Sequence, residues 1–216
     1  MYTPRSFQFQ DQEAMIGFMK QYSFATIVTI KDQLPVATHL PFVVNNSTGK
    51  LLLSGHFAAA NEQAEYIETT PSLVIFSEPH AYISPAHYDK HESVPTWDYI
   101  AVHAYGQAQV LCDTAAKVKV LEQMITFYDP AYLAQWHSLS DKYRQGMIQG
   151  IVAFELEVTN LQGQKKLSQN KTVAERERIA AHLEKSVQPL DQDLARHIRN
   201  LQIMYHGIYV TTRTGK

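Results

Sequence analysis

The feature that most constrains this fold is a series of short β-branched segments separated by short polar turns. FATIVTI (24–30) leads through the turn at 31–33 into a second apolar run, LPVATHLPFVV (34–44). NNSTG (45–49) forms another turn before KLLLSG (50–55). Strands joined by such short connections pair antiparallel, because parallel pairs need long crossovers. The pattern therefore predicts an antiparallel meander and argues against a doubly wound parallel sheet.

Further strands and inserted helices complete the predicted architecture. The additional strands are SLVIFS (72–77), AYIS (81–84), YIAVHAYGQAQVL (99–111) and IVAFELEVTNL (151–161). Two helices are predicted to begin after the capping residues Asp11 and Asp113. A third is predicted from the capping box Thr172/Glu175 to about Lys185, and a fourth over Asp191–Gln202. About six or seven strands with helices between them indicate a mainly β fold with α decoration (α+β), built as a β-barrel.

Composition places the chain among globular proteins. Hydrophobic residues make up 45% of the 216 residues, enough for a sizeable core. No run approaches the roughly 18 apolar residues of a membrane span, and MYTPRSFQFQDQE lacks the apolar region of a signal peptide. The single cysteine, Cys112, excludes an internal disulfide. We therefore expect a cytoplasmic protein with no membrane partner.

The formal net charge of −2 hides an asymmetry along the chain. Residues 1–162 carry nine Lys/Arg against 16 Asp/Glu, whereas residues 163–216 carry ten against five. We therefore expect a domain over 1–162 and a basic, mostly helical extension over 163–216 packed on it. Such an extension could meet phosphate, of a cofactor or of DNA, or simply present a solvated helical face.

Three segments carry residues suited to ligand chemistry, and the first is SGHFAAANEQ (54–63). We expect a strand to end here and a helix to begin almost at once. A helix N-terminus offers unpaired N–H groups and partial positive charge, which suits phosphate. Ser54 adds a hydroxyl and His56 a ring donor. The alternative is an ordinary strand-to-helix turn.

The second segment, residues 78–99, is rich in aromatic and histidine side chains. Its groups with metal-ligand chemistry are His87, Asp89 and His91. No second ligand pair has a recognised spacing, so we do not expect a metal site. The preferred interpretation is a loop that closes over a flat ligand, with Tyr82, Trp97 or Tyr99 near its rings. The alternative is an aromatic mini-core under a long loop.

In the third segment, GQKKLSQNK (163–171), two lysines precede Ser168, Gln169 and Asn170. Amide and hydroxyl side chains in a row can bond the donor and acceptor edge of a heterocycle. A helix cap with a solvated turn is the alternative. No Ser-His-Asp order, HExxH or CxxC motif is present.

Together these segments resemble the PaiB-type family of FMN-binding split-barrel proteins, which are described as negative transcriptional regulators. The resemblance rests on HLPF at His39, SGHFAAANEQ at Ser54, AYISPAHY at Ala81, VPTWDYIAVHAYG at Val94 and KLSQNK at Lys166. Five motifs in this order span nearly the whole chain. The family fold is similar to that of pyridoxamine-phosphate oxidase, so the resemblance implies an FMN-binding split β-barrel and a homodimer with FMN near the subunit interface.

The resemblance also implies roles for particular residues. Ser54, Gly55, His56 and Asn61 would lie near the flavin phosphate or ribityl chain, and His39 and Leu40 near the isoalloxazine. Tyr82, Ser84, Trp97 and Tyr99 would line the ligand cavity. Lys166, Ser168, Gln169 and Asn170 would complete the site, with the partner subunit as one possible source.

Two departures from the family pattern stand out. Asp98 occupies the position where we expect the Asn of the family's PTWNY motif. A carboxylate cannot donate as an amide can, so flavin binding would be weaker or pH-dependent if this position contacts the flavin. An arginine clamp for the phosphate is not evident in the N-terminal strands.

Two functions of different classes follow. One is an FMN-binding transcriptional repressor, with DNA contact through the basic C-terminal region. The other is a flavin-dependent oxidoreductase or flavin reductase, in which FMN supplies the chemistry. For the second, no acid or base has a convincing role; Tyr82, His87 and Tyr99 are the candidates.

Overall fold

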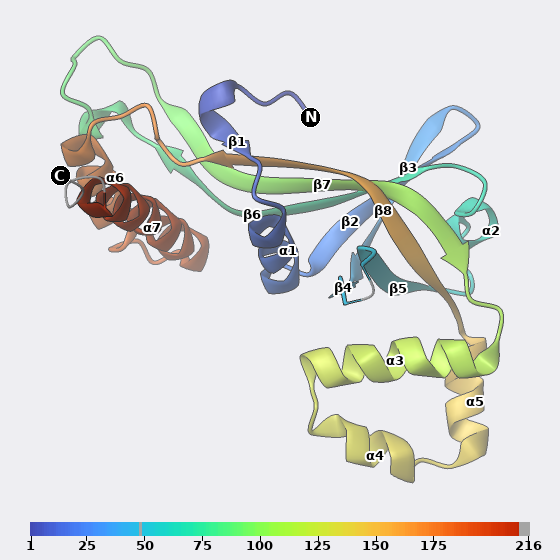
Figure 1. Cartoon of the computed structure of the whole chain (residues 1–216). Helices are drawn as coiled ribbons and strands as arrows, with labels where there is room; N and C mark the ends of the chain where they lie inside the picture. Colours follow the sequence, from blue (N-terminus) through green and yellow to red (C-terminus); the bar gives the residue numbers. More distant parts are fainter. Residues whose placement is uncertain (48, 212–216) are drawn as a thin grey trace. The chain divides into compact units, whose positions relative to one another are not determined.

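The computed structural model describes residues 1–47 and 49–211, and it divides into two compact units (Figure 1). Unit 1 comprises Met1–Gln10, Ser77–Ala101 and the chain from Gly163 onward. Unit 2 comprises Asp11–Phe76 and Val102–Gln162. Strands β6 (Ser72–Ile83), β7 (Thr96–Val110) and β8 (Ile151–Lys166) contribute residues to both.

Unit 2 contains the predicted meander. Its own strands are β2 (Phe24–Lys31), β3 (Leu34–Pro41), β4 (Val43–Asn45) and β5 (Leu52–Ala58). Its helices are α1 (Gln12–Gln21), α2 (Gln63–Tyr66), α3 (Thr114–Tyr128), α4 (Tyr132–Ser138) and α5 (Asp141–Gln149). The strand order is β3-β2-β6-β7-β8-β5-β4, and among the described residues no pairing of β3 with β4 closes the sheet. The mainly β class with inserted helices is therefore confirmed.

The core of unit 2 is built from phenylalanines that project from its strands. Phe42, Phe57, Phe76 and Phe154 are fully buried. The rings of Phe57 and Phe154 stack with centroids 4.9 Å apart, and Phe42 meets Phe76 edge-on at 6.0 Å. A Cβ at Gly55 would lie 3.2 Å from the Phe154 ring, so β5 runs close over this cluster.

Unit 1 holds three short elements, the strand β1 (Gln8–Phe9) and the 3-10 turns η1 (Arg5–Phe7) and η2 (Pro85–His87), together with two helices. The helices are α6 (Val173–Leu183) and α7 (Pro189–Thr211). They pack through buried apolar side chains, among them Ile179, Leu183, Leu194 and Ile198. The division into a 1–162 domain and a 163–216 extension stays a prediction, and residues 212–216 lie outside the described residues.

Several predicted boundaries were wrong. The two segments 72–77 and 81–84 form one strand, β6, and β8 continues to Lys166, five residues beyond the predicted end at Leu161. Helices α4 and α5 were not predicted at all. None of the helices in the described part of the chain has the length and apolar character needed to cross a bilayer.

Candidate functional site

The segment Ser54–His56 lies inside β5 and not at a helix start, so the predicted strand-to-helix geometry was wrong. The strand continues to Ala58, and the next helix, α2, begins only at Gln63 and has four residues. The cause is non-local: β5 pairs antiparallel with β8, and Ser54 faces Glu155 in the register. The Ser54 hydroxyl donates to Oε1 of Glu155 at 3.3 Å.

In the same strand, His56 has a ring nitrogen that forms no hydrogen bond within the fold. Its ring is half-buried, and Nδ1 is inaccessible and has no hydrogen-bond partner. Burial lowers the pKa of His56 below its usual value, so the ring is neutral at neutral pH. A neutral imidazole presents one donor and one acceptor, which suits either a phosphate oxygen or a hydroxyl.

In contrast, both ends of the Asn61 side-chain amide form hydrogen bonds within the protein. Its Nδ2 donates to Oγ1 of Thr38 at 3.0 Å, and its Oδ1 accepts from the backbone N–H of Gln63 at 2.9 Å. The fully buried Gln63 in turn donates to Oγ1 of Thr29 at 2.8 Å and to the carbonyl of Val36 at 3.1 Å. This network fastens the segment before α2 to the β2–β3 hairpin.

The β2–β3 hairpin carries the last two candidates of unit 2. His39 is exposed and its ring lies 6.4 Å from that of Phe24, whereas Leu40 is buried. Leu40 faces Ala25 in the register and His39 faces Thr26, so the two side chains point to opposite faces of the hairpin. Only His39 is therefore placed to offer a ring contact to a ligand on the outer face.

In unit 1 the aromatic candidates form an exposed group. Trp97 is 54% and Tyr82 51% exposed, and their rings meet edge-on at 6.2 Å. The ring of His80, which lies in β6 like Tyr82, has its centroid 5.9 Å from that of Trp97 in β7. Tyr99 is half-buried, and the Ser84 hydroxyl accepts the N–H of Ala86 as the cap of η2. Large exposed aromatic faces of this kind suit a flat ligand or a partner surface.

The segments around Trp97 and Ser168 are joined by buried polar contacts. Asp98 is fully buried and accepts a hydrogen bond of 2.6 Å from the Ser168 hydroxyl. Lys166 donates to the carbonyl of Trp97 at 2.7 Å and to the hydroxyl of Thr96. Sequence reasoning treated these as two separate segments, and the structure brings them together within unit 1.

Gln169 and Asn170 differ in how they are used. Both ends of the Gln169 side-chain amide form hydrogen bonds to nearby backbone groups. Oε1 accepts from the N–H of Leu167 at 2.7 Å, and Nε2 donates to the carbonyl of Lys165 at 2.6 Å. Asn170 is exposed. Of the row Ser168-Gln169-Asn170, two members therefore shape the turn after β8.

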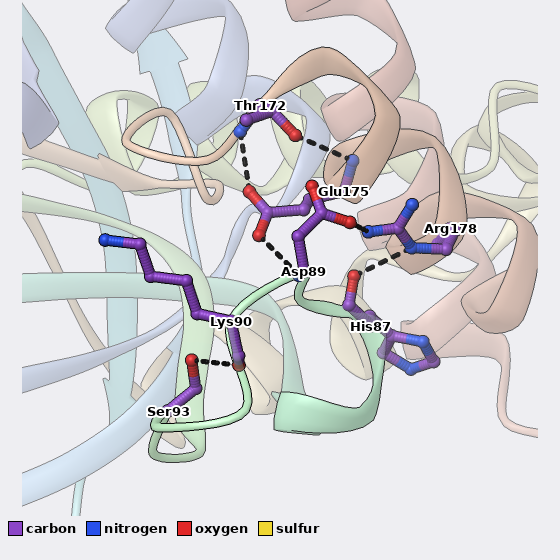
Figure 2. A network of polar contacts seen from close by, with 7 residues as sticks. All are labelled: His87, Asp89, Lys90, Ser93, Thr172, Glu175 and Arg178. Carbon is purple, nitrogen blue, oxygen red and sulfur yellow. Dashed lines mark hydrogen bonds and ion pairs between the residues drawn. The ribbon is translucent and has the colours of Figure 1, made fainter.

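A network of polar contacts fixes the β6–β7 loop to α6 (Figure 2), and only its capping box, Thr172 with Glu175, was predicted from the sequence. Glu175 accepts the N–H of Asp89 at 2.9 Å with one oxygen and the N–H of Thr172 at 2.8 Å with the other. Arg178 donates through Nε to the carbonyl of His87 at 2.9 Å and pairs with Asp89 at 2.5 Å. Asp89, considered above as a metal ligand, is thus an ion-pair partner in the loop.

Ionisable groups around the β6–β7 loop have pKa values shifted by their neighbours. The rings of His87 and His182 lie 4.7 Å apart. Burial, with the nearby His182 and Arg178, lowers the pKa of His87. Backbone hydrogen bonding to Asp89 and Thr172 lowers the pKa of Glu175. The loop therefore prefers an ionised Glu175 beside a neutral His87.

Several arginines of the basic C-terminal region are already paired with carboxylates of the fold. Arg199 binds Glu184 at 2.8 Å and also pairs with Glu177, while Arg178 pairs with Asp89. Charges already held by carboxylates release fewer counterions on meeting DNA. The cationic surface available to a nucleic acid is smaller than the count of arginines suggests.

Each unit thus brings its own candidates together. His39, Leu40, Ser54, Gly55, His56 and Asn61 lie in unit 2, and Tyr82, Ser84, Trp97, Tyr99, Lys166, Ser168, Gln169 and Asn170 lie in unit 1. That these two sets form one ligand site stays a prediction.

Comparison with known proteins identifies relatives over most of the chain. Residues 1–160 match the sequence profile of a family described as "Putative FMN-binding domain". The Bacillus subtilis "Protease synthase and sporulation protein PAI 2" is 36% identical over 199 residues, which cover 90% of this chain and 95% of that protein. An uncharacterized protein of Emericella nidulans is 28% identical over 188 residues, covering 68% of this chain and 74% of its own.

Two solved structures with a similar fold are flavoproteins by their titles. The FAD and heme binding protein from Mycobacterium smegmatis superposes with a TM-score of 0.60 at 16% identity, covering 74% of this chain and 73% of that one. The flavocytochrome Anf3 from Azotobacter vinelandii gives 0.60 at 15% identity, covering 76% and 72%. The split-barrel fold class inferred from the motifs is therefore confirmed.

Proposed function

Because the chain belongs to the FMN-binding domain family that its first 160 residues match, and to the PaiB-type group within it, we propose that it binds FMN as a negative transcriptional regulator. The observation that carries this proposal is the 36% identity to the Bacillus subtilis protein over 90% of the chain, together with the family match. Bound FMN would supply flavin redox chemistry or act as a sensed ligand.

The residues of unit 2 fit the polar part of this cofactor. The buried, unpartnered Nδ1 of His56 offers a hydrogen bond that the fold itself leaves unused. Ser54 precedes it, and Gly55 brings the backbone close without a side chain. We assign these three residues, with Asn61 as support, to the phosphate and ribityl chain, and the His39 ring with the backbone of Leu40 to the ring system.

The residues of unit 1 fit a flat ring. Tyr82 and Trp97 expose aromatic faces that can pack against an isoalloxazine. Lys166, Ser168, Gln169 and Asn170 provide amide, hydroxyl and cationic groups along one short segment, with Ser84 and Tyr99 nearby in sequence to the aromatic pair. In this proposal they complete the site.

We further propose a homodimer. The outer face of the β2–β3 hairpin, on which His39 lies, exposes two large apolar side chains: Phe24 is 65% and Ile30 46% exposed. β3 stands at the end of the strand order, so its free edge and this apolar face are both available to a second copy. A second copy would also allow residues of two subunits to share one flavin.

Titration of the purified, cofactor-free protein with FMN tests the cofactor. We expect quenching of flavin fluorescence, and a higher melting temperature because the ligand binds only the folded state. His56→Ala should weaken binding, whereas His137→Ala, on the exposed surface of α4, should not. Stabilisation by haem or FAD with none by FMN would overturn the assignment.

Three further measurements test the proposed dimer and separate the functional classes. Sedimentation equilibrium should show a dimer that Phe24→Glu dissociates and the exposed control Val187→Glu does not. A gel shift with promoter fragments in a salt series tests direct DNA contact, and no shift at low salt would exclude it. NAD(P)H oxidation by the FMN-loaded protein would instead support a flavin-dependent oxidoreductase.

A further inference from the structure

Lys166, at the end of β8, is the cationic residue assigned to the flavin site in unit 1, and its ammonium is already bound within that unit. Nζ donates a hydrogen bond of 2.7 Å to the carbonyl of Trp97 and another to the hydroxyl of Thr96. The ring centroid of Phe7 lies 6.0 Å from Nζ, within the range of a cation–π contact. Two of the three N–H donors of the ammonium are therefore directed at the start of β7.

A second contact from the same turn holds the next residue of β7. The Ser168 hydroxyl donates a hydrogen bond of 2.6 Å to the buried Asp98. Burial raises the pKa of Asp98, and the nearby ammonium of Lys166 opposes this shift. The charge of Lys166 thus already favours one ionised carboxylate, and a phosphate would have to compete with Asp98 for it.

The backbone that Lys166 holds carries the indole of the exposed aromatic group. Trp97 is 54% exposed, and its ring centroid lies 6.2 Å from that of Tyr82 and 5.9 Å from that of His80. Tyr82 and His80 both belong to β6, whereas Lys166 binds the Trp97 backbone from β8. The place of the indole beside the β6 rings therefore depends on where Lys166 fixes the first residues of β7.

We propose that Lys166 is a positioning residue for the flavin ring, which acts through the backbone of Trp97 and does not bind the phosphate. This assignment rests on the flavin site proposed above. A direct phosphate contact would make Lys166 important for the phosphorylated cofactor alone. A positioning role makes it equally important for FMN and for riboflavin, which has the same ring system without the phosphate.

Tryptophan fluorescence of the flavin-free protein tests the contact itself. The chain has two tryptophans, so Trp136→Phe leaves Trp97 as the reporter. In this background Lys166→Met, which keeps a long side chain and removes its donors, should lower the fluorescence anisotropy of Trp97, because the start of β7 is released. The matched control, Lys90→Met, removes the same charge from an exposed side chain of unit 1 (Figure 2). Equal anisotropy in the two variants would overturn the proposal.

Titration with both flavins tests the role in binding. Lys166→Met should weaken FMN and riboflavin by the same factor, about threefold to tenfold, as the loss of a hydrogen bond predicts. In a Trp97→Ala background the same substitution should have little further effect, since residues that act as a unit are not additive. Thr96→Val removes one acceptor and keeps Lys166, so it should weaken both flavins equally but less. It provides the same comparison if Lys166→Met does not fold.

The outcomes separate this proposal from the proposed function. A larger loss for FMN than for riboflavin would assign Lys166 to the phosphate and overturn the positioning role. An undiminished effect of Lys166→Met in the Trp97→Ala background would also overturn it. A parent protein that binds neither flavin would contradict the proposed function, and the anisotropy of Trp97 would still decide whether Lys166 fixes that ring.

Discussion

The hydroxyl of Ser168 donates a hydrogen bond of 2.6 Å to Oδ2 of Asp98, and both side chains are buried. Ser168 holds a left-handed backbone conformation with φ of 55°, which turns the chain after β8 back toward β7. The other carboxylate oxygen, Oδ1, is buried and has no partner. Burial therefore raises the pKa of Asp98 to about 6, although Ser168 and Lys166 oppose the shift.

This contact predicts a specific pH dependence of stability. Between about pH 4 and pH 6 the folded protein holds a proton on Asp98 that the unfolded chain has released, so the contribution of Asp98 to stability falls as pH rises. Above about pH 6 the cost is complete, at about 3 kcal/mol. Asp98→Asn cannot titrate, so its stability relative to the parent should rise by about this amount between pH 4 and pH 7.

Urea unfolding of both proteins at several pH values measures the difference. The control is Asp32→Asn, in the exposed β2–β3 turn, whose positive φ of 50° suits asparagine. Its stability relative to the parent should not follow the same curve. A difference between Asp98→Asn and the parent that stays constant across this range would show that folding does not raise the pKa of Asp98.

Glu175 links the β6–β7 loop to α6, and its removal should release both. Glu175→Ala loses the acceptor for the Asp89 N–H and half of the capping box with Thr172. Lost caps and charge-assisted hydrogen bonds predict a destabilisation of about 2 kcal/mol. Urea unfolding gives the free energy, and limited proteolysis should show faster cleavage within residues 85–95. The exposed loop residue Glu92, changed to Ala, is the control; equal proteolysis of the two variants would contradict the anchoring role.

Substitution of Asn61 distinguishes a role in the stability of the fold from a role in FMN binding. Because both ends of its amide bond to Thr38 and Gln63, Asn61→Ala should destabilise the cofactor-free protein by about 1–2 kcal/mol. Thermal unfolding without FMN measures this directly. Asn61→Asp keeps the acceptor for the Gln63 N–H and should lose less. An Asn61→Ala variant as stable as the parent, but weaker in FMN binding, would assign the residue to the cofactor alone.

The strands could be predicted because their signal is local. FATIVTI and IVAFELEVTNL combine β-branched residues with alternation, and both strands begin at the predicted residues. The capping box at Thr172 likewise marked the start of α6. Short-range preferences and the tertiary fold agree at these places.

The rest depended on contacts between distant residues. Ser54-Gly55-His56 has the composition of a turn, yet pairing with Glu155, 101 positions away, keeps it in β5. The bond between Glu175 and Asp89 spans 86 positions and had no local signal. α5 was missed because its sequence, DKYRQGMIQ, contains an interior glycine and few apolar residues, and Ile148 alone is buried.

At Gly106, β7 passes too close to β8 to leave room for a Cβ atom. A Cβ built there would lie 2.2 Å from the carbonyl oxygen of Glu157 and 2.5 Å from Cδ2 of Leu156. The backbone atom cannot move aside without breaking the strand, so Gly106→Ala should destabilise by about 3 kcal/mol or prevent folding. Gly17→Ala, in α1 with no atom within 4 Å of the new Cβ, should instead stabilise by about 0.5–1 kcal/mol. Urea unfolding or soluble yield compares the two, and a Gly106→Ala protein as stable as the parent would show that β7 and β8 are farther apart than the structure places them.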